Sequence, residues 1–179
     1  MSLETPTTRE QALDLKHNSQ RAQWTIYIFY GICALNLIAI LSGYLELRLL
    51  ERAQAGAYIS QEEANANDLR QTIIGVIKTL TYLASAVLFL SWFRRAYGNL
   101  HRLREYRLQY SENMAIWSFF IPFINLTRPF TIAKEIAYYT RKKLNKVSTG
   151  SDAALNPPVL GIWWALFIAT GILSNFSFR

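Results

Sequence analysis

Three blocks of apolar residues, each long enough to cross a bilayer, alternate with polar stretches along the chain. They run from Trp24 to about Leu47, from Gln71 to Phe93 and from Val159 to about Phe176. A helix rises 1.5 Å per residue, so about 20 apolar residues match a hydrocarbon core of about 30 Å. The pattern therefore predicts three membrane-spanning helices, over residues 24–47, 71–93 and 159–176.

A fourth apolar block, Met114 to Leu126, is shorter and contains a proline. Its length falls in the range that is typical of re-entrant or interfacial segments rather than spans. Pro122 removes a backbone donor near the middle of the block. We expect a short broken segment over 114–126 that enters the membrane and returns. The alternative is one tilted helix, extended to about Ala137 and kinked at Pro122, that crosses the membrane.

The distribution of basic residues predicts the orientation of these segments. Residues 48–70 contain three lysines and arginines, whereas residues 94–112 contain five and residues 127–158 contain six. Basic loops stay in the cytoplasm. The first stretch should therefore lie outside, and the other two and the N-terminus should be cytoplasmic. A complete crossing by 114–126 would place the most basic stretch outside, which favours the re-entrant interpretation.

A basic amphipathic helix is predicted after the broken segment, over about 129–147. Apolar and small residues recur there at helical spacing, while the basic residues lie mostly off that stripe. The stripe consists of Ala133, Ile136, Ala137, Thr140, Leu144 and Val147. Such a helix suits an anionic membrane surface. Packing against the cytoplasmic side of the protein itself explains the pattern equally well.

Composition supports the same architecture. The 179 residues are 51% hydrophobic and 17% charged, and the formal net charge is +7. Positive charge beside apolar segments favours the cytoplasmic membrane face and anionic lipids over nucleic acid. We expect an all-α integral membrane helical bundle, with a polar segment over 1–23 and a single transmembrane domain over 24–179. The first span is too long for a signal h-region, so we expect an uncleaved anchor.

Two polar residues lie within the predicted spans. Asn36 should form a structural hydrogen bond with another helix, because its amide is unfavourable against lipid. Lys78 lies near the start of the second span, where its side chain can snorkel to the interface or pair with Glu46. The alternative is a polar pathway lined by Lys78, Thr79, Thr81, Tyr82 and Ser85. At the intervening connection, Gly56 can end the first helix, and Ser60-x-x-Glu63 is a capping box that can begin the next.

Polar residues also gather around the broken segment. We expect Arg95, Tyr97, Asn99, Asn125, Arg128 and Glu135 to form a network at the cytoplasmic membrane face. Glu135 could pair with Arg95 or Arg128 and so tie the cytoplasmic helices together. The alternative is a structural role only, as snorkelling arginines, a helix cap and a turn. The single Cys33 and the separated His17 and His101 form no ligand set, so we expect neither a metal nor a cofactor.

The same region carries a family resemblance. Its pattern consists of Trp92-Phe93-x-Arg95-Ala96-Tyr97-x-Asn99-Leu100, Tyr110-Ser111, Phe120-Ile121-Pro122-Phe123-x-Asn125-Leu126-x-Arg128-Pro129-Phe130, Lys134-Glu135-Ile136 and Trp163-Trp164. Over roughly residues 70–175 the chain resembles the bacterial membrane-protein family known as domain of unknown function 4328. It departs from that pattern at Phe119-Phe120, where a Trp-Phe pair is common. The resemblance implies a multi-pass protein of the bacterial cytoplasmic membrane and supplies no catalytic residues.

No enzymatic motif accompanies these features. The sequence contains no Gly-rich phosphate loop, nucleophile elbow or HExxH pattern, so we do not expect an enzyme. We expect an interaction or scaffold protein that engages a protein partner, a second copy of itself or anionic lipid at the cytoplasmic face. The alternative is a small channel or transporter component that uses the broken segment around Pro122–Asn125.

Overall fold

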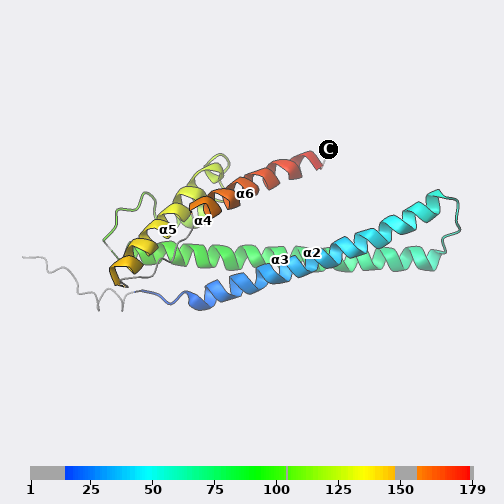
Figure 1. Ribbon diagram of the computed structural model, residues 1–179, viewed down its shortest axis with the longest axis horizontal. Coiled ribbons are helices and arrows are strands. Elements are labelled where there is room, and N and C mark those ends of the chain that lie inside the picture. Colours follow the sequence, from blue (N-terminus) through cyan, green and yellow to red (C-terminus); the bar gives the residue numbers. More distant parts are fainter. Residues whose placement is uncertain (1–14, 104, 148–156, 178–179) are drawn as a thin grey trace, which may run out of the picture. The chain divides into compact units, whose positions relative to one another are not determined.

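The structure of the protein, a computed structural model, describes residues 15–103, 105–147 and 157–177. Helices are the only regular secondary structure in these residues, which confirms the all-α prediction for this part of the chain (Figure 1). Most of the predicted polar N-terminal segment, residues 1–14, lies outside the described residues. The helices are α2 (Ser19–Gln54), α3 (Gln61–Arg102), α4 (Met114–Trp117), the 3₁₀ helix η1 (Ile124–Leu126), α5 (Arg128–Val147) and α6 (Pro157–Ser177).

Helices α2 and α3 extend well beyond their apolar blocks. The stretch 48–70, expected to be a polar connection, is mostly helical, because backbone hydrogen bonds continue into polar residues while hydropathy marks only the apolar part. Gly56 follows the end of α2 with a φ of 79°. The Glu63 N–H donates to Ser60 Oγ over 3.1 Å at the start of α3. The predicted end of the first helix at Gly56 and the predicted Ser60 cap at the start of the next are therefore confirmed.

The chain divides into two compact units. Unit 2 is Ser19–Trp92, and unit 1 comprises Met1–Asn18 and Phe93–Arg179, so α3 contributes to both. In unit 2, α2 and α3 run side by side as a helical hairpin (Figure 1). Both α2 and α3 are long and apolar enough to cross a membrane. The apolar part of α6 runs over Pro158–Gly171, and its crossing stays a prediction.

Unit 2 has the opposite burial pattern to a water-soluble hairpin. Its buried side chains are small or polar, and large apolar side chains such as Leu37 and Leu83 are exposed along both helices. The buried set is Thr25, Ser42, Asn67 and Ser85. Helices in lipid associate through small residues and hydrogen bonds, because lipid provides no hydrophobic force between them. The pattern is therefore the one expected of helices that are surrounded by lipid.

Unit 1 has an apolar core instead. On α3, Phe93, Tyr97 and Leu100 are spaced by four and three residues, so they share one buried face. Ile132 on α5 is completely buried, and Trp164 on α6 is nearly so. Among the described residues, every buried hydrophobic side chain belongs to unit 1. This unit is therefore stabilised by side-chain packing and positions the candidate site.

Aromatic rings connect the elements of unit 1. Phe93 on α3 meets Phe119 edge-to-face with ring centroids 5.6 Å apart, and Phe119 meets Phe167 on α6 at 6.3 Å. The ring of Trp164 stacks on Phe167 at 5.0 Å and on Phe130 of α5 at 5.9 Å. Contacts of this kind add about 0.5–1.5 kcal/mol beyond area burial. The series fixes the chain after α4 between α3 and α6.

Candidate functional site

A hydrogen-bonded node lies at the centre of unit 1. The Tyr97 hydroxyl donates to Glu135 Oε2 over 2.6 Å, and the Gln109 N–H donates to Glu135 Oε1 over 3.0 Å. The Tyr110 N–H donates to the Tyr97 hydroxyl oxygen over 3.2 Å. Tyr97 is completely buried and Glu135 is nearly so. The node therefore joins α3, α5 and the connection between α3 and α4 at one point.

The protonation of Tyr97 suits this role. Burial raises the pKa of the Tyr97 hydroxyl well above its ordinary value, and the hydrogen bond to Glu135 raises it further. Tyr97 follows the apolar block that ends at Phe93 and so lies outside the predicted span. The hydroxyl consequently stays protonated and acts as a donor at physiological pH.

The suggested ion pairs of Glu135 are wrong. Its partners are Tyr97 and a backbone N–H, because the connection after α3 brings its main chain beside the carboxyl group. Arg95 forms no hydrogen bond or ion pair with the described residues. The Arg128 guanidinium lies over the Tyr110 ring, 5.2 Å from its centroid, and donates to Met114 Sδ over 3.5 Å. Among the described residues, Arg128 therefore contacts Tyr110 and Met114, and it forms no hydrogen bond or ion pair with Glu135.

Asn99 binds main chain rather than another side chain. Its Oδ1 accepts from the Lys16 N–H over 3.1 Å, and its Nδ2 donates to the Lys16 carbonyl over 2.8 Å. The amide thus pairs with both polar backbone groups of one residue, as a neighbouring strand would. This contact attaches the segment before α2 to the end of α3, and nothing in the sequence pattern indicated it.

Gly98 allows the connection between α3 and α4 to approach α3 closely. A Cβ at this position would lie 2.7 Å from Glu112 Cδ, so any larger residue would displace the glutamate. Arg94 holds that stretch from the same helix. Its Nε lies 3.5 Å from Glu112 Oε1, and its Nη2 donates to Asn113 Oδ1 over 3.1 Å. These contacts place the start of α4 against α3.

The segment 114–126 is broken, and the single kinked helix through Ala137 is not formed. Helix α4 ends at Trp117 and α5 begins at Arg128, after η1. Phe123 between them has a φ of 65°, and the Ile124 N–H donates to the Pro122 carbonyl over 2.8 Å. That is a γ-turn centred on a bulky residue, a strained conformation of about 1–3 kcal/mol. The entry of this segment into the membrane and its return to the same side stay a prediction.

The two prolines of the motif have different environments. Pro122 is exposed, and its carbonyl closes the γ-turn. Pro129 is fully buried in the first turn of α5, where a missing N–H removes no helical hydrogen bond. Asn125 does not provide the expected side-chain cap. It donates its backbone N–H to the Ile121 carbonyl over 3.0 Å, and its side chain bonds no described residue.

Trp164 is the site residue that sequence reasoning missed. Its indole Nε1–H donates to the Leu126 carbonyl over 3.2 Å and so satisfies a backbone group freed at the break before α5. In the sequence, Trp163 and Trp164 lie near the start of the last predicted span, where tryptophan is typical of an interfacial anchor. A tryptophan placed there fits either role, and only the packing of α6 against α5 distinguishes them.

The polar residues of unit 2 pair across the hairpin. Asn36 Nδ2 donates to the Tyr82 hydroxyl over 3.1 Å, which is the expected interhelical hydrogen bond. The suggested Lys78–Glu46 pair is not formed, because Glu46 Oε2 accepts from Gln71 Nε2 over 2.8 Å. Lys78 is partly exposed and bonds no described residue. Among the described residues, the lysine therefore contributes no interhelical hydrogen bond or ion pair to the hairpin.

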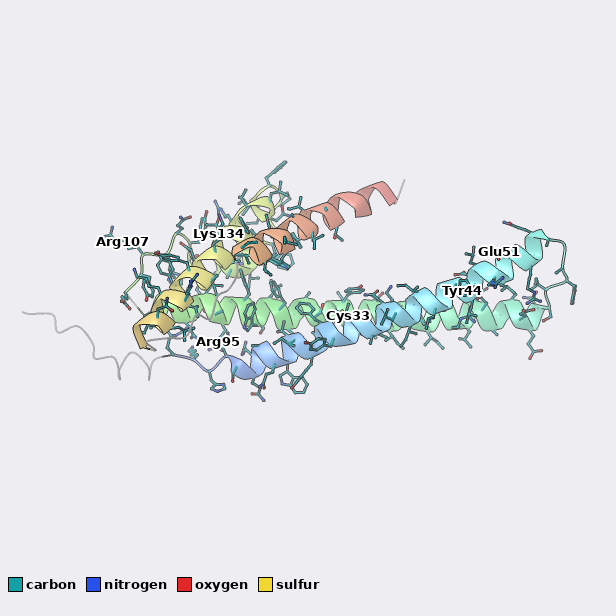
Figure 2. All side chains as sticks on the ribbon, in the orientation of Figure 1. Cys33, Tyr44, Glu51, Arg95, Arg107 and Lys134 are labelled. Carbon is teal, nitrogen blue, oxygen red and sulfur yellow. The ribbon has the colours of Figure 1, made fainter. Side chains whose placement is uncertain are left out.

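Charge is divided unequally between the units. The described residues of unit 1 include eleven lysines and arginines against three glutamates, whereas those of unit 2 include five against five acids. Figure 2 shows three of the cations of unit 1, Arg95, Arg107 and Lys134, which come from α3, the following connection and α5. Among the described residues, no group of three His, Cys, Asp or Glu side chains could hold a metal ion.

The residues of the node and the broken segment lie within one matched family. Residues 55–179 match the family described as "domain of unknown function (DUF4328)". The matched residues include Tyr97, Pro122, Arg128 and Glu135. The chain belongs to this family. Comparisons with curated proteins and with solved structures find no match. The resemblance in the sequence is therefore confirmed, and the DUF4328 description assigns no activity.

Proposed function

We propose that this DUF4328 protein is a multi-pass membrane protein whose unit 1 binds anionic lipid headgroups at the cytoplasmic face. The observation that carries the proposal is the exposed side of α5. Lys134, Arg141 and Lys142 are exposed there, together with Tyr138 and Leu144. The first part of the same helix is fixed to the protein through Ile132 and Glu135. A basic helix with exposed apolar side chains suits an anionic membrane surface.

The proposed topology follows from the charge of the two units. Unit 1 is strongly basic, so the positive-inside rule favours the cytoplasm for it, and α2, α3 and α6 would each span the membrane. The N-terminus is then cytoplasmic, and the segment 114–126 begins and ends on that side. The polar connection after α2 lies outside.

Cysteine labelling tests this topology. Single cysteines at Gly56, Tyr110 and Ser148 in a Cys33→Ser background would be treated with an impermeant maleimide from each side of inverted and right-side-out vesicles. We expect positions 110 and 148 to react only from the cytoplasm and position 56 only from outside. If positions 110 and 148 react from opposite sides, the segment between them crosses and the topology is wrong.

Binding of anionic lipid can be measured at α5. A Leu144→Cys reporter in the same background, carrying an environment-sensitive dye, would be compared in nanodiscs with and without phosphatidylglycerol. We expect the dye to enter an apolar environment only with the anionic lipid. Each basic residue near such a surface contributes about 1 kcal/mol. Arg141→Gln with Lys142→Gln should therefore weaken this docking about 30-fold, and raised salt should weaken it as well.

The matched control is Arg48→Gln with Arg52→Gln, which removes two cations from α2 in unit 2. This pair should leave the α5 signal unchanged. A dye response of the same size without phosphatidylglycerol, or after loss of Arg141 and Lys142, would contradict the proposal. A protein partner for the basic face would then have to be sought instead.

The channel alternative has less support. A conducting path needs polar groups or charges along its lining. Between Pro122 and Asn125 the exposed side chains are apolar, with Asn125 as the one polar residue. The polar residue Asn36 is already bonded to Tyr82. The described residues therefore favour a surface that contacts lipid over a path for ions.

A further inference from the structure

The segment Trp117–Leu126, which we call the tip, exposes large apolar side chains. We propose that the tip inserts its apolar side chains into the upper acyl region of the cytoplasmic leaflet. Its partner is then lipid, and its depth is limited to that leaflet. The inference rests on the membrane location in the proposed function, but it does not require the anionic headgroup contact of α5.

Burial in the tip is inverted relative to a turn in water. Phe123 is 85% exposed, and Trp117 and Phe120 are also largely exposed, whereas Ser118 is 0% exposed. A turn that faces water normally exposes its serine and buries its aromatic residues. The Ser118 hydroxyl bonds no described residue, so no hydrogen bond holds it inside. The tip therefore presents large apolar side chains outward and keeps the Ser118 hydroxyl inside.

The backbone of the tip is also suited to an apolar solvent. Every N–H from Ser118 to Thr127 except that of Phe123 donates to a backbone carbonyl, and Pro122 has no N–H. Water would satisfy such groups in an exposed loop, whereas hydrocarbon cannot, and irregular chain at membrane depth must satisfy them internally. The tip meets this requirement for all of its N–H groups but that of Phe123, although it is not a continuous helix.

The apolar surface of the tip continues onto a predicted span. Phe119 of the tip meets Phe167 of α6 edge-to-face with ring centroids 6.3 Å apart, and Phe167 is itself partly exposed. Lipid in contact with Phe167 would therefore also meet the tip. This continuity favours lipid over a protein partner as the occupant.

The length of the tip limits its depth. The backbone hydrogen bonds from Met114 to Ile121 are of the helical i−3 and i−4 types. These eight residues rise about 12 Å at 1.5 Å each. A hydrocarbon core is about 30 Å thick. After the γ-turn, η1 returns the chain to α5, so the tip can reach only into one leaflet.

Depth-dependent quenching tests the inference on the full chain. A dye at Phe123→Cys in a Cys33→Ser background would be measured in phosphatidylcholine vesicles, with spin labels near the headgroup end or deep in the acyl chains. We expect stronger quenching by the shallow label and little by aqueous iodide. Gln109→Cys, on an exposed residue of unit 1, should instead respond to iodide. Leu80→Cys, exposed in the middle of the second span, should respond most to the deep label.

Three results would overturn the inference. Quenching by iodide would place the tip in water, and stronger quenching by the deep label would place it at the bilayer centre. A dye in an apolar environment that neither quencher reaches would mean that protein covers the tip. Phe120→Cys provides a second reporter if Phe123→Cys does not fold. These vesicles contain no anionic lipid, so quenching at the tip does not depend on the binding of α5 to anionic headgroups. Insertion of the tip can therefore be supported when the lipid binding of α5 is contradicted, and contradicted when that binding is supported.

Discussion

Glu135→Ala should destabilise unit 1 by about 2–5 kcal/mol. The substitution removes the only acceptor shown for the buried Tyr97 hydroxyl, and an unsatisfied buried donor costs about 1–3 kcal/mol. It also removes the acceptor of the partly buried Gln109 N–H, which adds to the loss. Equilibrium unfolding in mixed micelles would measure the change. Hydrogen exchange adds a local readout, since the Gln109 and Tyr110 amides should lose protection before those of α2.

Two variants test whether the hydrogen bonds of the node are energetically coupled. Glu135→Gln keeps the shape and one acceptor oxygen, so it should cost less than Glu135→Ala. Tyr97→Phe removes the hydroxyl that joins Glu135 to the Tyr110 N–H. Combined with Glu135→Ala, it should show a coupling energy of at least about 0.5 kcal/mol. Additive effects and unchanged exchange at residues 109 and 110 would show that the node does not hold the connection.

Trp164→Ala should cost about 3–5 kcal/mol, as large-to-small changes at buried aromatic residues do. The indole stacks on Phe130 and Phe167 and donates to the Leu126 carbonyl. Its removal leaves a cavity between α5 and α6 and frees a backbone carbonyl at the base of the tip. Equilibrium unfolding in micelles, followed by near-ultraviolet circular dichroism, would report the loss of aromatic packing.

Trp164→Phe separates the two contributions. A phenyl ring keeps most of the stacking but cannot donate, so it should cost only about 1 kcal/mol for the lost hydrogen bond. The matched control is Trp117→Ala, because Trp117 is exposed in the same unit and should change stability by less than about 0.5 kcal/mol in micelles. Equal losses at positions 117 and 164 would contradict the assignment of Trp164 to the core.

Local patterns in the sequence were sufficient to identify the helices and several of their ends. Hydropathy located the apolar blocks that became α2, α3 and α6, and Gly56 and Ser60 marked the connection between the first two. Pro122 located the break in the fourth block. These inferences depend on residues that are close in sequence, where helical spacing, backbone dihedral preferences and capping chemistry act directly.

The partners of the motif residues were less predictable. Charge suggested that Glu135 would pair with an arginine, but its partners are a phenol and a main-chain N–H. The Asn99 side chain likewise binds the backbone of Lys16, which lies 83 residues away. A sequence records which groups can donate and accept, but it does not show which backbone groups the fold brings to them. Any main-chain N–H or carbonyl is an equally available partner until the chain is folded.

The sequence by itself determined that this chain is helical, that it belongs to the DUF4328 family and that its apolar blocks alternate with basic stretches. Only the tertiary structure decided which apolar residues form a core. Phe93, Ile132 and Trp164 are buried, whereas Phe123 and Leu83 are exposed, although all are strongly apolar. The physical reason is that burial depends on which helix faces meet in space. Hydropathy measures the affinity of a side chain for an apolar environment, and protein and lipid both provide one.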